Sequence, residues 1–239
     1  MAPGYRILPC GDAAFAVEYG EDIDPALNNR VLALDSALQD LPGVIETVPT
    51  YRSVLVHYDP LRQSFDALVA AVRPLAEAAE PRAPAGRTWR IPVTYGGENG
   101  IDLEATAEAR GISPEELIAR YSAPTYRVYM IGFLPGFAYL GGLDPTIATP
   151  RRTNPRLKTP AGTISIGGIQ AAVASIEAPS GWHLLGRTPV RNFMPGREPV
   201  FILEPGDGVR FHPISAGRFA ELDRAAAAGE LVAEQEPGS

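Results

Sequence analysis

Glu80-Pro81-Arg82-Ala83-Pro84-Ala85-Gly86-Arg87 divides this chain of 239 residues into two segments of different character. The octapeptide is rich in Pro, Ala and Gly and has no apolar period, which is typical of a linker. We therefore predict a linker over residues 81–88, an N-terminal domain over residues 1–80 and a second domain over residues 89–230. The chain ends in Glu-Gln-Glu-Pro-Gly-Ser, so residues 231–239 are predicted to form a tail.

The segment before the linker has the pattern of a small α+β domain. Two amphipathic helices are predicted over Pro25–Gln39 and Phe65–Ala79, and each follows a pair of short β-like runs. The order ββαββα indicates a small sheet with helices on one face, close to a ferredoxin-like layer. The predicted strands are Tyr5–Leu8, Ala14–Tyr19, Val44–Val48 and Val54–Tyr58.

The segment after the linker has the pattern of a β-barrel. Gly and Pro number 24 each in the whole chain, and many of them separate short apolar runs beyond residue 88. Many short strands with frequent turns are typical of a closed barrel. Helices are predicted over Asp102–Arg110, Pro114–Tyr121 and Phe219–Ala228. The predicted strands are Trp89–Val93, Tyr126–Ile131, Thr163–Ile166, Ala171–Ile176, Trp182–Leu185, Val200–Leu203 and Val209–Phe211.

Composition and charge narrow the class of protein. The net charge of −7 and the pI near 5.1 argue against a nucleic-acid partner, because phosphate backbones bind basic faces. No apolar run approaches the roughly 18–20 residues that cross a bilayer, so no membrane partner is expected. Cys10 is the only cysteine and no signal-peptide pattern is present, which together predict a cytoplasmic protein.

Several common catalytic motifs are missing from the sequence. Lys158-Thr159 follows Leu157 and not glycine, so the phosphate-binding turn of a P-loop is absent. The three histidines lie far apart without the spacing of metal ligands, and we predict no metal site. These patterns assign no catalytic residue.

The segment Thr149–Gly162 concentrates positive charge in an acidic protein. It holds four cations within eight residues, namely Arg151, Arg152, Arg156 and Lys158. Guanidinium groups match the oxygens of carboxylates and phosphates, and the neighbouring prolines stiffen the loop. The segment therefore predicts either an anion site or a solvated loop whose arginines pair with surface acids.

A second unusual segment, Gly132–Leu143, places aromatic residues between glycines. Phe133, Phe137 and Tyr139 could line a ligand pocket with their ring faces, and the adjacent backbone N–H groups could bind polar atoms. The same segment could instead be a loop packed against the core.

Ordered motifs along the chain resemble those of the bacterial family of B-type 5-oxoprolinase subunits. That family is also called allophanate hydrolase subunit 1, and it includes the sporulation kinase inhibitor KipI. The resemblance covers nearly the whole chain. The motifs that carry it are Pro49–Ser53, Tyr58–Pro60, Ile91–Glu98, Gly132–Leu143, Thr149–Arg156, Pro160–Gly162, Ile166–Gln170, Gly181–Pro189 and Pro205–Phe211.

This resemblance implies a small α+β domain followed by a cyclophilin-like β-barrel. It also implies a C-type partner, also called KipA, and a third subunit, with ATP consumed by the complex as 5-oxoproline is opened to glutamate. Under that hypothesis four arginines are charge partners for the substrate, three aromatic residues form the pocket wall, and Gln170 binds the edge of a cyclic amide. The arginines are Arg151, Arg152, Arg156 and Arg187, and the aromatic residues are Phe133, Phe137 and Tyr139.

The segment Ala171–Ser175 departs from the resemblance. The family usually reads Thr-Gly-Ile-Tyr-Pro after the glutamine, whereas this chain has Ala-Ala-Val-Ala-Ser after Gln170. The chain thus lacks a hydroxyl, a glycine and an aromatic ring of the family pattern, and the substrate is not determined. Three alternatives to a 5-oxoprolinase component stay open. These are an allophanate hydrolase or carboxyltransferase component, a KipI-like regulator that inhibits a histidine kinase, and a prolyl isomerase on a barrel scaffold.

Overall fold

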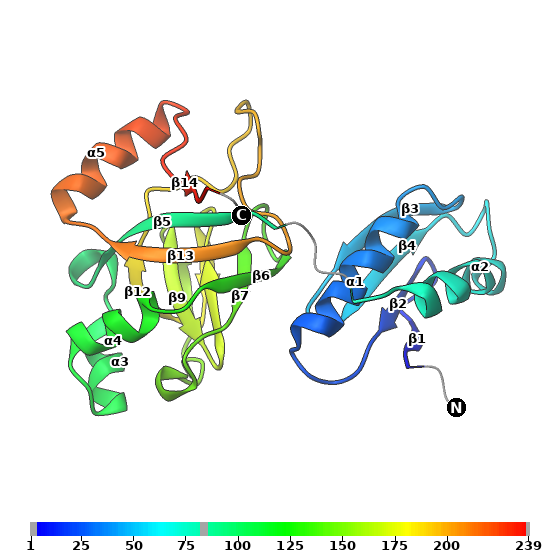
Figure 1. Cartoon of the computed structure of the whole chain (residues 1–239), viewed down its shortest axis with the longest axis horizontal. Helices are drawn as coiled ribbons and strands as arrows, with labels where there is room; N and C mark the ends of the chain where they lie inside the picture. Colours follow the sequence, from blue (N-terminus) through cyan, green and yellow to red (C-terminus); the bar gives the residue numbers. More distant parts are fainter. Residues whose placement is uncertain (1–3, 82–85, 238–239) are drawn as a thin grey trace. The chain divides into compact units, whose positions relative to one another are not determined.

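The computed structural model describes residues 4–81 and 86–237, and the chain separates into two compact units between residues 85 and 86 (Figure 1). Residues 82–85 of the predicted linker lie outside the described residues. Thr88, the last residue of that linker, already begins a strand of the second unit.

The N-terminal unit is a four-stranded antiparallel sheet with two helices. Its strands lie in the order β1-β2-β4-β3. This arrangement corresponds to a ferredoxin-like fold whose last strand has moved to the front of the chain. The elements are β1 (Arg6–Pro9), β2 (Ala14–Glu18), α1 (Pro25–Leu38), β3 (Val44–Pro49), β4 (Ser53–Tyr58) and α2 (Phe65–Ala78).

Strand alternation builds the core of this unit. Phe15 and Val17 of β2 and Val54 and Val56 of β4 are fully buried, because every second residue of a strand points to the same face of the sheet. The same apolar cluster includes residues of both helices, among them Leu34. The two helices therefore cover one face of the sheet, as the ββαββα order predicts.

The second unit is a closed barrel of seven strands. The strands follow one another as β12-β9-β10-β7-β6-β13-β5, and a pairing between β12 and β5 closes the ring. The prediction of an α+β unit followed by a β-barrel is confirmed. The strands are β5 (Thr88–Tyr95), β6 (Tyr126–Ile131), β7 (Ala138–Gly141), β9 (Thr163–Gly167), β10 (Gln170–Val173), β12 (His183–Arg187) and β13 (Gly208–Pro213).

Part of the arginine-rich segment is a strand and not a loop. β8 (Arg156–Thr159) pairs with β11 (Ala178–Ser180) in a separate two-stranded sheet. Conversely, the strand predicted over Val200–Leu203 is absent, and Phe201 forms only an isolated bridge. Asn192 holds this segment instead, because its side-chain oxygen accepts from the Leu203 backbone N–H at 2.7 Å.

Within the tail predicted over residues 231–239, residues 233–236 are held by contacts with the barrel unit, and residues 238–239 lie outside the described residues. Glu234–Gln235 forms β14, which pairs with Arg90 and Trp89 of β5. Ala233 is buried, and the Glu236 backbone N–H donates to the Thr88 carbonyl at 2.8 Å. Burial of one small side chain together with strand hydrogen bonds anchors the segment, and these contacts are invisible in its polar composition.

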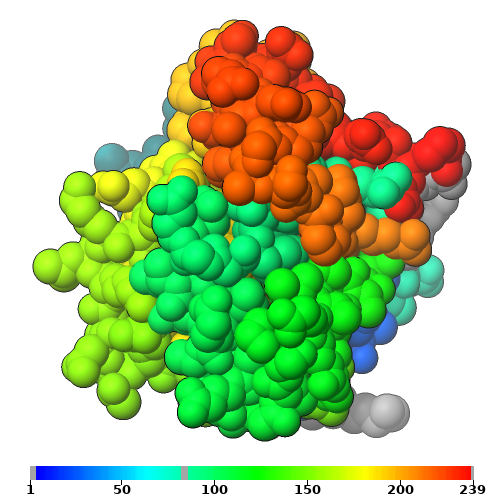
Figure 2. Space-filling view, turned by 90° about the vertical axis from the view of Figure 1, so that its left-hand side faces the viewer, coloured from blue at the N-terminus to red at the C-terminus, as the bar shows by residue number. Residues whose placement is uncertain are grey.

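Helical segments cover the face of the barrel unit that Figure 2 shows, where the green and orange atoms lie. They are α3 (Leu103–Arg110), α4 (Pro114–Ser122) and α5 (Ala216–Ala227), and two short 3-10 turns, η1 (Gly97–Asn99) and η2 (Pro145–Ile147), accompany them. α3 and α4 bury Leu103 and Leu117 in the barrel core, whereas Ala226 is the only buried residue of α5. Among the described residues, no helix has the length and apolar character needed to span a membrane.

Candidate functional site

A pocket on the barrel unit is walled mainly by aromatic rings. Its volume is about 230 Å³. The rings come from the loop between β6 and β7, which runs directly into β7, and from the turn before β12. The segment that carries Arg151 is the third part of the lining. Its lining residues are Phe133, Phe137, Tyr139, Arg151, Pro179, Ser180, Gly181 and Trp182.

Four rings follow one another along the wall. Phe133 meets Phe137 edge-on with ring centroids 5.7 Å apart, and Phe137 lies 4.8 Å from Tyr139. Tyr139 in turn meets Trp182 edge-on at 6.0 Å. These are the favoured edge-to-face and tilted arrangements of aromatic pairs. The wall is therefore a continuous apolar surface that suits a flat ligand.

Arg151 supplies the positive charge of this pocket. Its guanidinium carbon lies 5.4 Å from the centre of the Trp182 ring, within the range of a cation–π contact. Within the described part of the chain, Arg151 makes no ion pair and no hydrogen bond through its side chain. His183 helps to hold the loop, since its ring nitrogen lies 2.9 Å from the Pro150 carbonyl oxygen. The Arg151 guanidinium therefore remains available to an anionic ligand.

Phe133 is held in a strained backbone conformation at the edge of the pocket. Its φ is 68°, in the left-handed region that bulky residues rarely adopt, and 60% of the residue is exposed. The Gly132 backbone N–H donates to the Phe137 carbonyl at 3.1 Å, which closes the loop tightly around Phe133. Gly136 also has a positive φ, and a Cβ there would lie 2.7 Å from the Phe193 Cβ. The loop thus presents an aromatic ring at an energetic cost.

The structure brings Arg152 and Arg156 together around one buried carboxylate, that of Asp102. Arg156 donates to both carboxylate oxygens, at 2.9 and 2.7 Å, and Arg152 lies 3.3 Å from one of them. The Leu184 backbone N–H donates to the same carboxylate at 2.8 Å. Burial acts to raise the pKa of Asp102, but the hydrogen bonds and positive charges outweigh it, so the pKa is lowered. These arginines neutralise an internal acid, and neither lines the pocket.

Gln170 and Arg187 also lie outside the pocket lining. Gln170 begins β10 opposite Gly167, and the Trp182 ring occupies the place of a Gly167 side chain at 2.3 Å. Because residues directly opposite share a face of the sheet, Gln170 lies on the same face as Trp182. Arg187 is separate, since its guanidinium lies 5.4 Å from the ring of Phe219 in α5.

Two residues of this region, Trp182 and Asp102, are not among the predicted site residues. Trp182 stands within a sequence motif, and it could have been selected as one of only two tryptophans. Asp102 is separated from its arginine partners by 50 residues or more. No local pattern links such distant positions, so only the folded barrel identifies this pairing.

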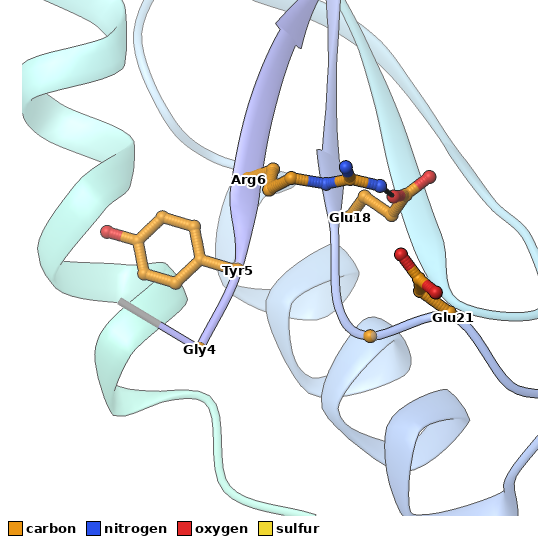
Figure 3. A pocket seen from close by; sticks show the side chains of 6 residues that line it. Gly4, Tyr5, Arg6, Glu18 and Glu21 are labelled. Atoms are coloured by element: carbon orange, nitrogen blue, oxygen red, sulfur yellow. Dashed lines mark hydrogen bonds and ion pairs between the residues drawn. The ribbon is translucent and has the colours of Figure 1, made fainter. Parts of the chain in front are cut away.

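A second hollow lies in the N-terminal unit and has different chemistry. Its volume is about 310 Å³, and it is lined by Gly4, Tyr5, Arg6, Glu18, Gly20 and Glu21. Figure 3 shows that Arg6 reaches across to Glu18, with which it forms an ion pair. The Tyr5 ring points away to Arg73 and Glu77 of α2. Since the central charges neutralise each other, the aromatic pocket is the better candidate despite its smaller volume.

The residues of both units match one known protein family. Residues 5–203 match the family model described as the carboxyltransferase domain, subdomain C and D. The chain belongs to this carboxyltransferase-domain family. The match includes the pocket residues from Phe133 to Trp182 and ends before α5.

Other members of the carboxyltransferase-domain family are similar over most of the chain. The B-type 5-oxoprolinase subunits of Bacillus subtilis (strain 168) and Escherichia coli O157:H7 are 39% and 38% identical over 90% and 89% of this chain. The matches cover 95% and 97% of those two proteins.

Two solved structures that are similar to this chain share its fold. The crystal structure of TTHA0988 matches with a TM-score of 0.77 and 36% identity over 85% of this chain, which spans 40% of that protein. The urea amidolyase of K. lactis matches with a TM-score of 0.83 over 98% of this chain and 16% of its own, at 19% identity. The latter likeness concerns the fold alone.

In this carboxyltransferase-domain chain, small residues underlie the pocket. Ala172 and Ala174 pack with Phe137 and Trp182 in one buried cluster. The departure seen in the sequence over Ala171–Ser175 therefore falls directly beneath the aromatic wall. Within residues 4–81 and 86–237, no group of three or more His, Cys, Asp or Glu side chains is placed to hold a metal ion.

Proposed function

We propose that this chain is the B-type component of an ATP-dependent 5-oxoprolinase complex that opens 5-oxoproline to glutamate. Its partners in this proposal are a C-type (KipA-like) protein and a third subunit. The observation that carries the proposal is a pocket of four aromatic rings with an unpaired arginine, in a chain 38–39% identical to two 5-oxoprolinase subunits of the B type.

The pocket suits the chemistry of 5-oxoproline. This substrate is a flat five-membered lactam with one carboxylate, so it needs an apolar surface and one cation. Phe137, Tyr139 and Trp182 supply ring faces for the lactam, and Arg151 pairs with the carboxylate. Phe133 lies at the edge, where its exposed ring can cover the bound lactam and exclude water.

Residues outside the lining support this arrangement. Gln170 does not line the pocket, but it shares a sheet face with Trp182, and in this proposal its carboxamide reaches the amide edge of the lactam from beside the pocket. Arg152 donates its backbone N–H to the Gly181 carbonyl at 2.7 Å, and its side chain reaches Asp102. These contacts keep the segment that carries Arg151 against the turn that carries Trp182.

ATP supplies the phosphoryl group that activates an otherwise unreactive lactam carbonyl. The task of this chain is then to bind the lactam, to orient its carbonyl and to keep bulk water away from the ring. The proposal assigns the nucleotide to the complex as a whole.

The test is reconstitution of the complex. The chain is expressed with its candidate C-type partner and purified, the third subunit is added, and ATP hydrolysis is measured with 5-oxoproline, allophanate or other lactams. We expect 5-oxoproline to stimulate hydrolysis, and Arg151→Ala to lose most of the stimulation with a raised KM. Arg62→Ala removes an exposed arginine of the N-terminal unit and serves as the matched control.

The substrate that stimulates ATP hydrolysis distinguishes the possible functions. Stimulation by allophanate but not by 5-oxoproline would favour the urea-type reaction, in line with the 26% identical urea amidolyase of Lachancea kluyveri. Absence of stimulation by every substrate in a well-formed complex would overturn the enzymatic proposal and favour a regulatory protein.

A further inference from the structure

A cluster of three arginines lies beside α5, away from the aromatic pocket. Arg187 stands at the end of β12, and Arg191 and Arg197 follow in the next segment. Residues lining the pocket do not include any of the three. The chain has a net charge of −7, so a group of three arginines outside the pocket is unusual.

The cluster has more cations than ion-pair partners. Arg191 pairs with Asp223 of α5 at 2.5 Å. Arg187 donates through Nε to the Ala161 carbonyl at 3.2 Å, and Arg197 donates to the carbonyls of Pro199 and Arg191. Among the described residues, no carboxylate lies within 4.0 Å of the Arg187 or Arg197 guanidinium. In the part of the chain that the structure describes, Asp223 is therefore the one carboxylate that pairs with this group of three arginines.

Partial burial makes this imbalance costly. Arg187 and Arg197 are half-buried, and desolvation lowers the pKa of both guanidinium groups. Asp223 and Glu98 of η1 attract Arg187 from a distance, while Arg191 repels it. A guanidinium carries five N–H donors, and only one donor of Arg187 has a partner within the described chain. The remaining donors of Arg187 are available to an oxyanion.

The helix that covers the cluster is weakly attached. α5 buries only Ala226, and most of its other side chains are exposed or half-buried. Two of its side chains contact the cluster: the Phe219 ring packs against Arg187, and the Asp223 carboxylate pairs with Arg191. A helix with so little buried apolar surface is readily displaced, because tertiary packing supplies most of the stability of a short helix.

We propose that Arg187 and Arg191 form an anion-binding site for a phosphate group, and that the Asp223 carboxylate of α5 occupies part of this site in the free chain. A phosphate with charge near −2 is a stronger partner for two guanidinium forks than one carboxylate. Binding therefore displaces Asp223 and loosens α5. Arg197 adds positive charge beside the site.

Calorimetric titration of the full-length chain with inorganic phosphate and, separately, with ATP tests this proposal. Asp223→Asn removes the competing carboxylate, and we expect it to tighten phosphate binding about fivefold. The double variant Arg187→Ala/Arg191→Ala should lose binding. Glu221→Gln is the matched control, because it neutralises an exposed acid on the same helix that pairs with Arg218.

Hydrogen exchange provides the second readout. Phosphate should accelerate amide exchange in α5 of the wild-type chain and leave that of α1 unchanged. ATP that competes with phosphate identifies a nucleotide as the source of the group, whereas binding of phosphate alone identifies the free ion. Binding that persists in the double arginine variant, or no binding by the wild type and Asp223→Asn, would overturn the proposal. These assays need no turnover, so their result is independent of the 5-oxoprolinase proposal.

Discussion

The carboxylate of Asp102 receives both terminal amino groups of Arg156, at 2.9 and 2.7 Å, across 54 residues of sequence. This bidentate pair joins the chain before α3 to the start of β8. Arg152 and the Leu184 backbone N–H complete the partners of the carboxylate. The pair therefore ties three segments of the barrel unit together around one buried charge.

Asp102→Asn should destabilise the chain. The substitution leaves two partly buried guanidinium groups without a countercharge, and breaking a buried pair in this way costs about 2–4 kcal/mol. Urea unfolding followed by circular dichroism measures the loss. Glu177→Gln, which removes an exposed partner of Lys158, is the control and should leave the midpoint unchanged. Equal midpoints for Asp102→Asn and the wild type would contradict the structural role of the pair.

The contribution of Asp102 should vanish in acid. Its pKa is lowered in the folded state from an ordinary value of 3.8. A lowered pKa means that the stabilisation is complete above pH 3.8 and is lost as the pH falls through the folded-state value. We expect the stability difference between wild type and Asp102→Asn to be constant near neutral pH and to shrink below pH 3.8. A difference that grows on acidification would have the wrong sign.

Gly167→Ala should displace Trp182. An added Cβ would lie 2.3 Å from the indole ring, so the ring or the strand must shift, at a cost of about 1–3 kcal/mol. Tryptophan fluorescence reports the movement, with Trp89 as the only other indole. Gly132→Ala is the matched control, because its nearest neighbour is the flexible end of Met130 at 3.4 Å. An unchanged spectrum for Gly167→Ala would show that the ring is not held there.

Phe133→Gly should separate stability from function. Glycine relieves the strain of the positive φ, so the free energy of unfolding should rise by about 1 kcal/mol or stay level. Under the proposed function, turnover of the complex should fall because the exposed ring is lost. Phe133→Ala keeps the strain but removes the ring, so it should show the same functional loss without the gain in stability. Full activity of both variants would exclude a role for this ring in substrate binding.

Removal of β14 should weaken the barrel unit. A chain that ends at Val232 loses the buried Ala233 and the hydrogen bonds to β5, so its thermal midpoint should fall. A chain that ends at Pro237 keeps these contacts and should unfold like the full-length protein. Differential scanning calorimetry compares the two chains. Equal thermal midpoints would show that β14 does not stabilise the barrel unit and would support the prediction of a free tail.

Elements with regular apolar patterns could be predicted from the sequence. The helix predicted over Pro25–Gln39 is α1 (Pro25–Leu38), and Ser64 caps α2 by accepting from the Ala67 N–H. The strands β7, β8 and β11 could not, because each is only three or four residues long and lies in a segment rich in Gly, Pro or Arg, a composition typical of loops. Pairing with neighbouring strands, and not the residue types of the segments themselves, makes these segments strands.

The sequence by itself determined the two-part architecture, the α+β and barrel classes and the aromatic segment that supplies much of the pocket wall, because these depend on local composition and period. Only the tertiary structure decided the roles of the arginines. Arg151 lies on Trp182, Arg152 and Arg156 bind Asp102, and Arg187 lies under α5. The sequence shows the positive charge of each arginine directly, but the partner of that charge lies tens of residues away along the chain. Closure of the barrel brings each guanidinium to its partner, and no local pattern encodes that distance.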